Sequence, residues 1–105
     1  MVKAILITCA FAMPLLTGSA HAQDADARAA QYLAGNCANC HGTTGTALGA
    51  MPSLAGQPKA QMVEQMKAFR DGKRPATIMH QLSKGYTDQQ IELIADHFSR
   101  QKPAR

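Results

Sequence analysis

Residues 37–41 of the chain read Cys37-Ala38-Asn39-Cys40-His41. Two cysteines separated by two residues, with a histidine directly after the second, are the attachment signature of haem c, in which both thiols bind the porphyrin and the imidazole ligates the iron. This spacing lets one helical turn present both sulfurs to the same porphyrin edge. The motif therefore predicts a covalent haem c held by Cys37, Cys40 and His41, and its single occurrence predicts one haem.

Three other interpretations of the motif are a thioredoxin-like redox pair, half of a zinc site, and a chance arrangement of surface residues. A zinc site calls for a second pair of ligands, which the sequence lacks. A redox dithiol calls for alternating strands and helices, which the sequence pattern does not predict. The histidine directly after the second cysteine favours haem over all three.

The first 22 residues have the pattern of an export signal. Lys3 supplies a short positive region, residues 4–16 are an apolar run, and residues 20–22 form a small-x-small cleavage site. A membrane anchor needs about 20 apolar residues, whereas Pro14 and polar residues interrupt this run. We therefore expect residues 1–22 to be a signal peptide that is cleaved after Ala22, and the protein to be periplasmic without stable membrane insertion.

The remaining chain, residues 23–105, is long enough for one domain. Cys9 would leave with the signal peptide, so only the two cysteines of the motif remain and no disulfide framework is available. A domain this small usually needs a staple besides its core, and the haem would supply it. The net charge is +4 and the basic residues are dispersed, which suits docking to an acidic protein surface and does not favour nucleic-acid binding.

The hydrophobic pattern predicts an all-α fold with three main helices and loops. An alanine-rich helix is expected over residues 25–36, with Asp24 as its N-cap and Gly35 ending it before the haem motif. Its core face is predicted to consist of Ala29, Tyr32 and Leu33. Residues 42–56 are rich in glycine and threonine and predict a loop, in which the glycines either allow close backbone approach to a flat ligand or are ordinary loop residues.

The second half of the chain predicts two amphipathic helices with a short helical piece between them. The first opens at Pro58 and ends at Gly72, and the short piece over residues 77–83 is terminated by Gly85. Thr87 and Gln90 form a capping box at the start of the last helix. The predicted core positions are Met62, Val63, Met66 and Phe69 in the first helix, and Ile91, Ile94, Ala95 and Phe98 in the last.

With its haem motif after an N-terminal helix and an amphipathic helix at the end, residues 23–105 resemble the class I c-type cytochromes. Ala29 and Leu33 stand where that family carries a small residue and an aromatic or aliphatic one that cross the C-terminal helix. His97 departs from the aromatic residue often found at its position. Residues 51–56 resemble the family's Pro-x-Leu-x-Gly segment, which implies that the Pro52 carbonyl accepts a hydrogen bond from His41 and orients it.

The finer pattern is most similar to the monohaem cytochrome subunit of flavocytochrome c sulfide dehydrogenase and to halves of dihaem periplasmic cytochromes. Residues 54–57, 69–74 and 77–88 carry this resemblance. It implies Met79 as the sixth iron ligand, with the neighbouring His80 as its rival. Further residues implied at the haem propionates are Arg74, which is otherwise an exposed turn residue, and Tyr86.

Histidine and methionine ligation fills both axial positions of the iron, which suits single-electron transfer and leaves catalysis to a partner. Two functions follow as expectations. The chain is either the electron-accepting subunit of an FAD-containing flavoprotein that oxidises sulfide, or a free carrier between a respiratory complex and a terminal oxidase or reductase. A ligand sensor with an open iron is disfavoured by Met79.

Overall fold

The computed structural model describes residues 19–103, and residues 1–18 of the predicted signal peptide lie outside the described part. Its elements, in chain order, are α1 (Ser19–His41), α2 (Lys59–Arg70), α3 (Met79–Leu82), a 3₁₀ turn (Ser83–Gly85) and α4 (Asp88–Ser99). These described residues contain helices and loops and no strand, so the predicted all-α class is confirmed. Within residues 19–103, no helix combines the length and the apolar character needed to cross a membrane.

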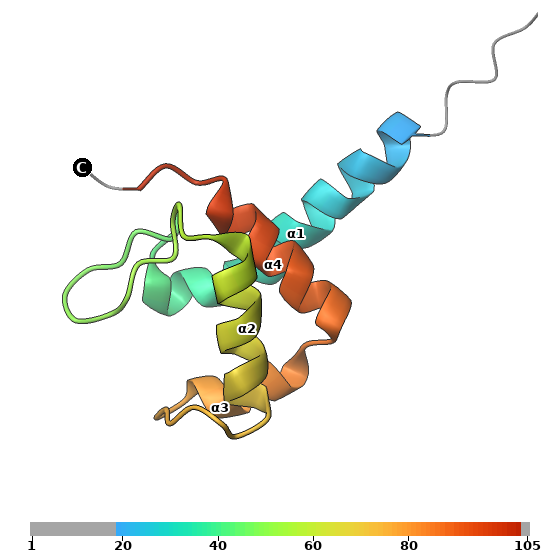
Figure 1. Cartoon of the computed structure of the whole chain (residues 1–105). Coiled ribbons are helices and arrows are strands. Elements are labelled where there is room, and N and C mark those ends of the chain that lie inside the picture. The colour runs from blue at the N-terminus through green and yellow to red at the C-terminus, as the bar shows by residue number, and fades with distance from the viewer. Residues whose placement is uncertain (1–18, 104–105) are drawn as a thin grey trace, which may run out of the picture.

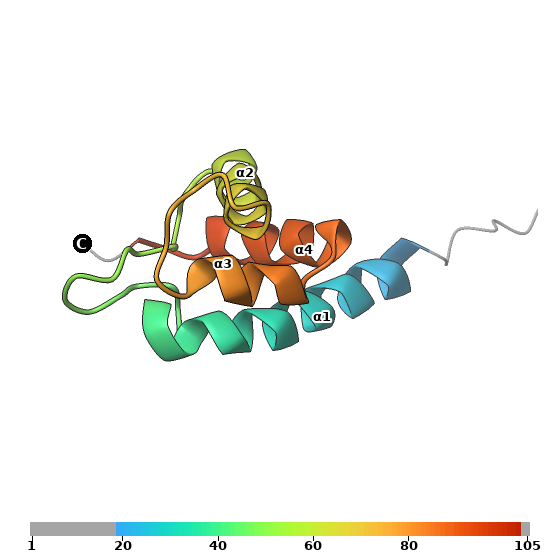
Figure 2. The same cartoon turned by 90° about the horizontal axis from the view of Figure 1, so that it is seen from below.

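The core lies where α1, α2 and α4 meet: α4 crosses α1 in Figure 1 and lies directly over it in Figure 2. Its buried members are Ala34 from α1, Met62 from α2, and Ile94, Ala95 and Phe98 from α4. Phe98 and Ile91 are completely buried. The apolar stripe predicted for the last helix is therefore confirmed, and Met62 is the most deeply buried residue of the stripe predicted for α2.

Helix α1 differs from the prediction at both ends and on its core face. Asp24, predicted as N-cap, lies inside the helix, and Gly35 does not end it, because the helix continues to His41. A glycine inside a helix costs only about 1 kcal/mol, and the half-buried Cys37 and buried His41 beyond it gain packing that outweighs this cost.

The buried face of α1 also differs from the prediction. It is formed by Ala30 and Ala34, whereas Tyr32 is 83% exposed and was wrongly placed in the core. Leu33 packs on the edge of the core as predicted. Small alanines at the crossing allow α1 and α4 to approach closely. Because alanines occur on every face of this helix, the hydrophobic periodicity does not show which of them are buried. Phe98 supplies the aromatic ring of the α1–α4 core. The ring of His97, the residue that departs from the family's aromatic, meets the Phe98 ring edge-on with centroids 5.2 Å apart.

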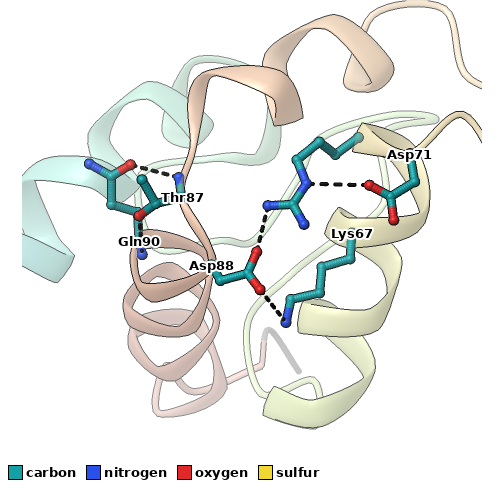
Figure 3. Close-up of polar contacts among 6 residues, drawn as sticks. Lys67, Asp71, Thr87, Asp88 and Gln90 are labelled. Atoms are coloured by element: carbon teal, nitrogen blue, oxygen red, sulfur yellow. Dashed lines mark hydrogen bonds and ion pairs between the residues drawn. The ribbon is translucent and has the colours of Figure 1, made fainter.

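The helix boundaries in the second half lie close to the predicted ones. Pro58 is the N-cap of α2 and not its first residue, and Gly72 follows the C-cap with a φ of 71°. The capping box of α4 is confirmed in both directions, since Gln90 N–H donates to Thr87 Oγ1 over 3.2 Å and Thr87 N–H donates to Gln90 Oε1 over 2.9 Å (Figure 3).

Ion pairs join α2 to α4. The carboxylate of Asp88 pairs with Lys67 Nζ at 3.1 Å and with Arg70 Nη1 at 2.6 Å. Figure 3 shows Asp88 facing Lys67. Lys59 of α2 also pairs with Glu92 of α4 at 3.1 Å. These contacts lie between helices, so spacing along the sequence gave no sign of them.

Candidate functional site

Cys37 and Cys40 lie in the last two turns of α1. Positions three residues apart on a helix differ by about 60° around its axis, so the two side chains leave the same flank of α1. Neither cysteine forms a disulfide; Cys37 is half-buried against the core and Cys40 is exposed. Burial raises the pKa of the Cys37 thiol, partly offset by a backbone hydrogen bond, and this favours its protonated form.

His41 is the last residue of α1 and is only 8% exposed. Its Nδ1 lies 2.7 Å from the carbonyl oxygen of Pro52. Because a carbonyl oxygen can only accept, Nδ1 carries the proton and donates it, which leaves Nε2 with a free lone pair. The predicted contact between His41 and Pro52 is thus present, and it holds the ring with its ligating nitrogen available.

The loop after α1 is held in shape by backbone hydrogen bonds and by glycines. The carbonyl of Gly45 accepts from Leu54 N–H at 2.7 Å and from Ala55 N–H at 3.0 Å, which closes the loop and fixes the segment that contains Pro52. Gly42 has a φ of 89°, and a Cβ there would collide with the carbonyl of Thr46. These glycines do permit close approach, but the group approached is the protein itself: a Cβ at Gly45 would lie 2.7 Å from Cδ1 of Phe98.

Met79 is the first residue of α3, a short helix that packs on α2 (Figure 2). It is half-buried, as is His80. The Nδ1 atom of His80 is buried and finds no hydrogen-bond partner within residues 19–103. Met79 and His41 therefore come from separate segments, and the structure leaves both Met79 and its rival His80 as predicted ligands.

Tyr86 and Arg74 have protein neighbours of their own. The amide of Asn36, the residue before Cys37, donates to the Tyr86 hydroxyl over 3.4 Å. Tyr86 also packs against the core, so it links the segment before α4 to the end of α1. The guanidinium of Arg74 lies 4.8 Å from the ring centroid of Phe69, a cation–π contact on an exposed turn. Neither contact bears on a propionate, and that role stays a prediction for both residues.

The residues present fit a covalently attached haem. Two cysteine side chains leave one flank of a helix, and a buried imidazole beside them keeps Nε2 available because its other nitrogen is hydrogen-bonded. Sequence reasoning missed Asn36, which ties Tyr86 to the motif. An asparagine outside the motif carries no signal until the fold brings Tyr86 beside it.

Comparison with known proteins decides the family. The sequence profile described as "Cytochrome c" matches residues 26–100, which include all of the site described above. The chain belongs to the cytochrome c family. This cytochrome has the class I fold and carries a covalently bound haem c, as the motif predicted.

Several cytochromes of bacteria are similar to this one. It is 37% identical over 68 residues to the cytochrome subunit of sulfide dehydrogenase of Chlorobaculum tepidum, which covers 65% of this chain and 62% of that protein. It is 41% identical over 88 residues to cytochrome c4 of Pseudomonas aeruginosa, which covers 83% of this chain and 43% of the relative. Cytochrome c-554(548) of Halomonas halodenitrificans is 37% identical over 81 residues, or 73% of this chain and 98% of the relative.

A solved structure supports the same conclusion. Cytochrome c4 of Acidithiobacillus ferrooxidans matches with a TM-score of 0.68 at 29% identity, over 72% of this chain and 50% of that chain. The cytochrome thus spans less than two thirds of the first two relatives and half of the solved one. What is shared across all these matches is electron transfer by a haem c domain.

Proposed function

We propose that this cytochrome transfers single electrons in the periplasm as the electron-accepting subunit of a flavoprotein sulfide dehydrogenase. The observation that carries the electron-transfer part is the bond from His41 to the Pro52 carbonyl, which fixes the imidazole with Nε2 free beside two thiols. The similarity to a cytochrome subunit of sulfide dehydrogenase supports the partner.

Cys37 and Cys40 are proposed to hold the haem through thioether bonds, with His41 as one axial ligand. The bound haem supplies a one-electron iron centre. Pro52 keeps the imidazole oriented and makes it a better ligand through the hydrogen bond at Nδ1. Boiling the purified protein in acid acetone tests the attachment: the haem should stay with the polypeptide, and extraction into the solvent would refute the two thioether bonds.

Met79 is proposed as the second axial ligand, which would leave no position at the iron for a substrate. A sulfur-to-ferric-iron bond gives a weak far-red charge-transfer band. We expect this band in the wild type, its loss in Met79→Ala, and its retention in His80→Ala. The opposite pattern in the two variants would assign the position to His80 and predict a lower reduction potential. Arg74 and Tyr86 are proposed at the propionates.

The flavoprotein partner is proposed to contain FAD and to carry out the oxidation of sulfide itself. Gel filtration tests the assignment: the cytochrome and a sulfide-oxidising flavoprotein should stay together at high salt, and sulfide should reduce the haem only when both are present. A cytochrome that elutes alone and is not reduced would contradict it.

A freely diffusing carrier is the second candidate. Two observations favour it: the chain covers 98% of the Halomonas halodenitrificans cytochrome, and it is 32% identical to a protein named thiosulfate dehydrogenase electron acceptor in Thiomonas intermedia. This candidate predicts rapid reduction by a respiratory complex at low salt without a stable complex. The periplasmic location has its own test, since N-terminal sequencing of the exported protein should begin at Gln23.

A further inference from the structure

Helix α3, which begins at Met79, is too short to fix its own position. It comprises the four residues Met79–Leu82 and continues into the 3₁₀ turn Ser83–Gly85. One helical turn forms few hydrogen bonds for the backbone freedom that it loses, so it needs packing to be stable. None of its four residues is fully buried, and Leu82 is 48% exposed. The position of Met79 therefore depends on contacts outside α3.

Ser83, the residue directly after α3, makes such a contact. Among residues 21–103 it is the only polar residue with an exposed fraction of 0%. Its hydroxyl donates to Sδ of Met66 in α2 over 3.6 Å, and both α3 and the 3₁₀ turn pack on α2 (Figure 1). A buried hydroxyl without an acceptor costs free energy, so the bond to Met66 favours the position in which Ser83 is docked on α2.

The backbone of Ser83 connects this contact to Met79 and to the end of α1. Its N–H donates to the carbonyl oxygen of Met79. Its own carbonyl oxygen accepts from Tyr86 N–H over 3.3 Å, and the Tyr86 hydroxyl accepts from the amide of Asn36, next to the haem motif. Ser83 is thus the point at which the segment with the proposed ligand is joined to α2 and, through Tyr86, to α1.

A methionine ligand depends on support of this kind. Its side chain has three rotatable bonds and a neutral sulfur, so it holds a metal less firmly than an imidazole that a hydrogen bond orients. The fraction of molecules with Met79 at the iron is then set by how well the backbone of α3 is held in place. For His41 the Pro52 carbonyl supplies the support, and for Met79 the contacts of Ser83 can supply it.

We propose that Ser83 is a positioning residue for Met79, because its hydroxyl bond to Met66 holds the α3 segment on α2 and so keeps Met79 at the iron. This inference rests on the proposed ligation by Met79 and adds the pair of residues that maintains it. Ser83 acts through the backbone of α3. Its loss therefore changes how often Met79 leaves the iron and not which residue is the ligand.

Competition with imidazole tests the proposal on the oxidised holoprotein without any protein partner. Imidazole binds only when Met79 is detached, so its apparent affinity rises in proportion to the detached fraction. Ser83→Ala should raise this affinity about threefold, as expected for the loss of one weak hydrogen bond. Met66→Leu nearly conserves the volume but removes the acceptor, and it should have the same effect. Loss of the far-red band during the titration measures the displacement.

The double variant shows whether the two residues act as a pair. Ser83→Ala combined with Met66→Leu should raise the affinity about threefold again, and not the roughly ninefold expected of independent effects. Two matched controls should leave it unchanged. Met62→Leu makes the same exchange one turn earlier in α2, and Ser99→Ala removes a hydroxyl that donates to the Asp96 carbonyl within α4 over 2.8 Å.

Urea unfolding of the same variants separates positioning from a general effect on stability. A lower urea midpoint with unchanged imidazole affinity would show that Ser83 only stabilises the fold. Equal changes of affinity in Met62→Leu and Met66→Leu would show that any exchange in α2 loosens Met79. Either result, or a ninefold effect of the double variant, overturns the proposal. If Ser83→Ala does not fold, Met66→Leu against Met62→Leu decides.

Met79→Ala separates the inference from its basis. With no methionine to displace, this variant should bind imidazole more tightly than every other one. If it binds no more tightly than the wild type, Met79 is not the ligand, and both the ligation and the role of Ser83 are refuted. If it binds tightly while Ser83→Ala and Met66→Leu match the wild type, the ligation stands and only the positioning role is overturned.

Discussion

Residues 29–58 and residues 59–103 of this cytochrome hold their shapes by different means. The first part has no charged side chain, and it fixes its loop with backbone hydrogen bonds to Gly45 and with glycines, two of which, Gly42 and Gly45, leave no room for a Cβ. The second part is fixed by an apolar stripe, a capping box and ion pairs around Asp88.

The difference teaches where each part is vulnerable. Backbone hydrogen bonds between uncharged groups depend little on salt, but this part tolerates almost no added side chain at its tightest positions. Helices joined by exposed ion pairs tolerate substitution, because each such pair contributes only about 0–1 kcal/mol, but they respond to pH and salt. The two parts should therefore fail under different perturbations.

The largest effect is expected at the end of α1, within the uncharged part. His41→Ala removes the proposed ligand and the donor to the Pro52 carbonyl together, so we expect no stable low-spin haem product in the absorption spectrum. His97→Ala, in the charged part, is the control and should keep that spectrum. A normal low-spin spectrum for His41→Ala would refute the ligand assignment.

Gly45→Ala should destabilise the holoprotein by about 2–4 kcal/mol in urea unfolding. Its φ of 79° is strained for a side chain, and the new Cβ would press on Phe98 and on the backbone of Ala55. Gly49→Ala is a matched control with a φ of 67° and open space around the Cβ, so only the strain of about 1 kcal/mol remains. Equal losses would mean that contact with Phe98 is unimportant.

Thr87→Ala tests the charged part and should cost about 1 kcal/mol, because it leaves the Gln90 N–H at the start of α4 without its acceptor. Thr77→Ala changes an exposed threonine outside any helix and should be nearly neutral. Urea unfolding of both variants measures the difference. If the two variants unfold at the same midpoint, the capping box contributes nothing to stability.

The smallest effect concerns Asp88, whose pKa is lowered first by the hydrogen bond from Arg70 and then by that from Lys67. A carboxylate with a lowered pKa stabilises the folded state above its unfolded pKa of about 3.9, and this contribution is lost as the pH falls through the lower folded value. Asp88→Asn should therefore be slightly less stable than the wild type at pH 7, and its free energy of unfolding should fall less steeply as the pH is lowered. Half-molar salt should shrink its difference from wild type, and an unchanged difference would exclude an ionic origin.

How far the sequence predicted the fold depended on whether the signal was local. The capping box at Thr87 and the stripe of α4 involve residues within one helix, and both were predicted correctly. The continuation of α1 through Gly35 was missed, since a glycine weakens a helix only slightly and burial of His41 outweighs it. Tyr32 was misplaced because Ala30 and Ala34, with little hydrophobicity of their own, are selected by the close approach of α4.

The site shows the same division. Cys37, Cys40 and His41 are contiguous and were found from spacing, and the contact of His41 with Pro52 followed from the family resemblance. The positions of Arg74 over Phe69 and of Asn36 beside Tyr86 depend on how separate segments meet. No pattern along the chain encodes such contacts, so the propionate roles of Arg74 and Tyr86 stay predictions.

The core joins the first described helix to the last, from Ala34 of α1 to Phe98 of α4. Synthesis begins at the N-terminus, so α1 is complete long before α4 exists. Until then, Cys37 lacks the neighbours that half-bury it in the finished fold. Bringing α4 back onto α1 closes a long loop of chain, which costs more entropy and takes longer than forming one helix. The order of the helices thus gives the haem-attachment residues a period of access that ends when the last helix docks.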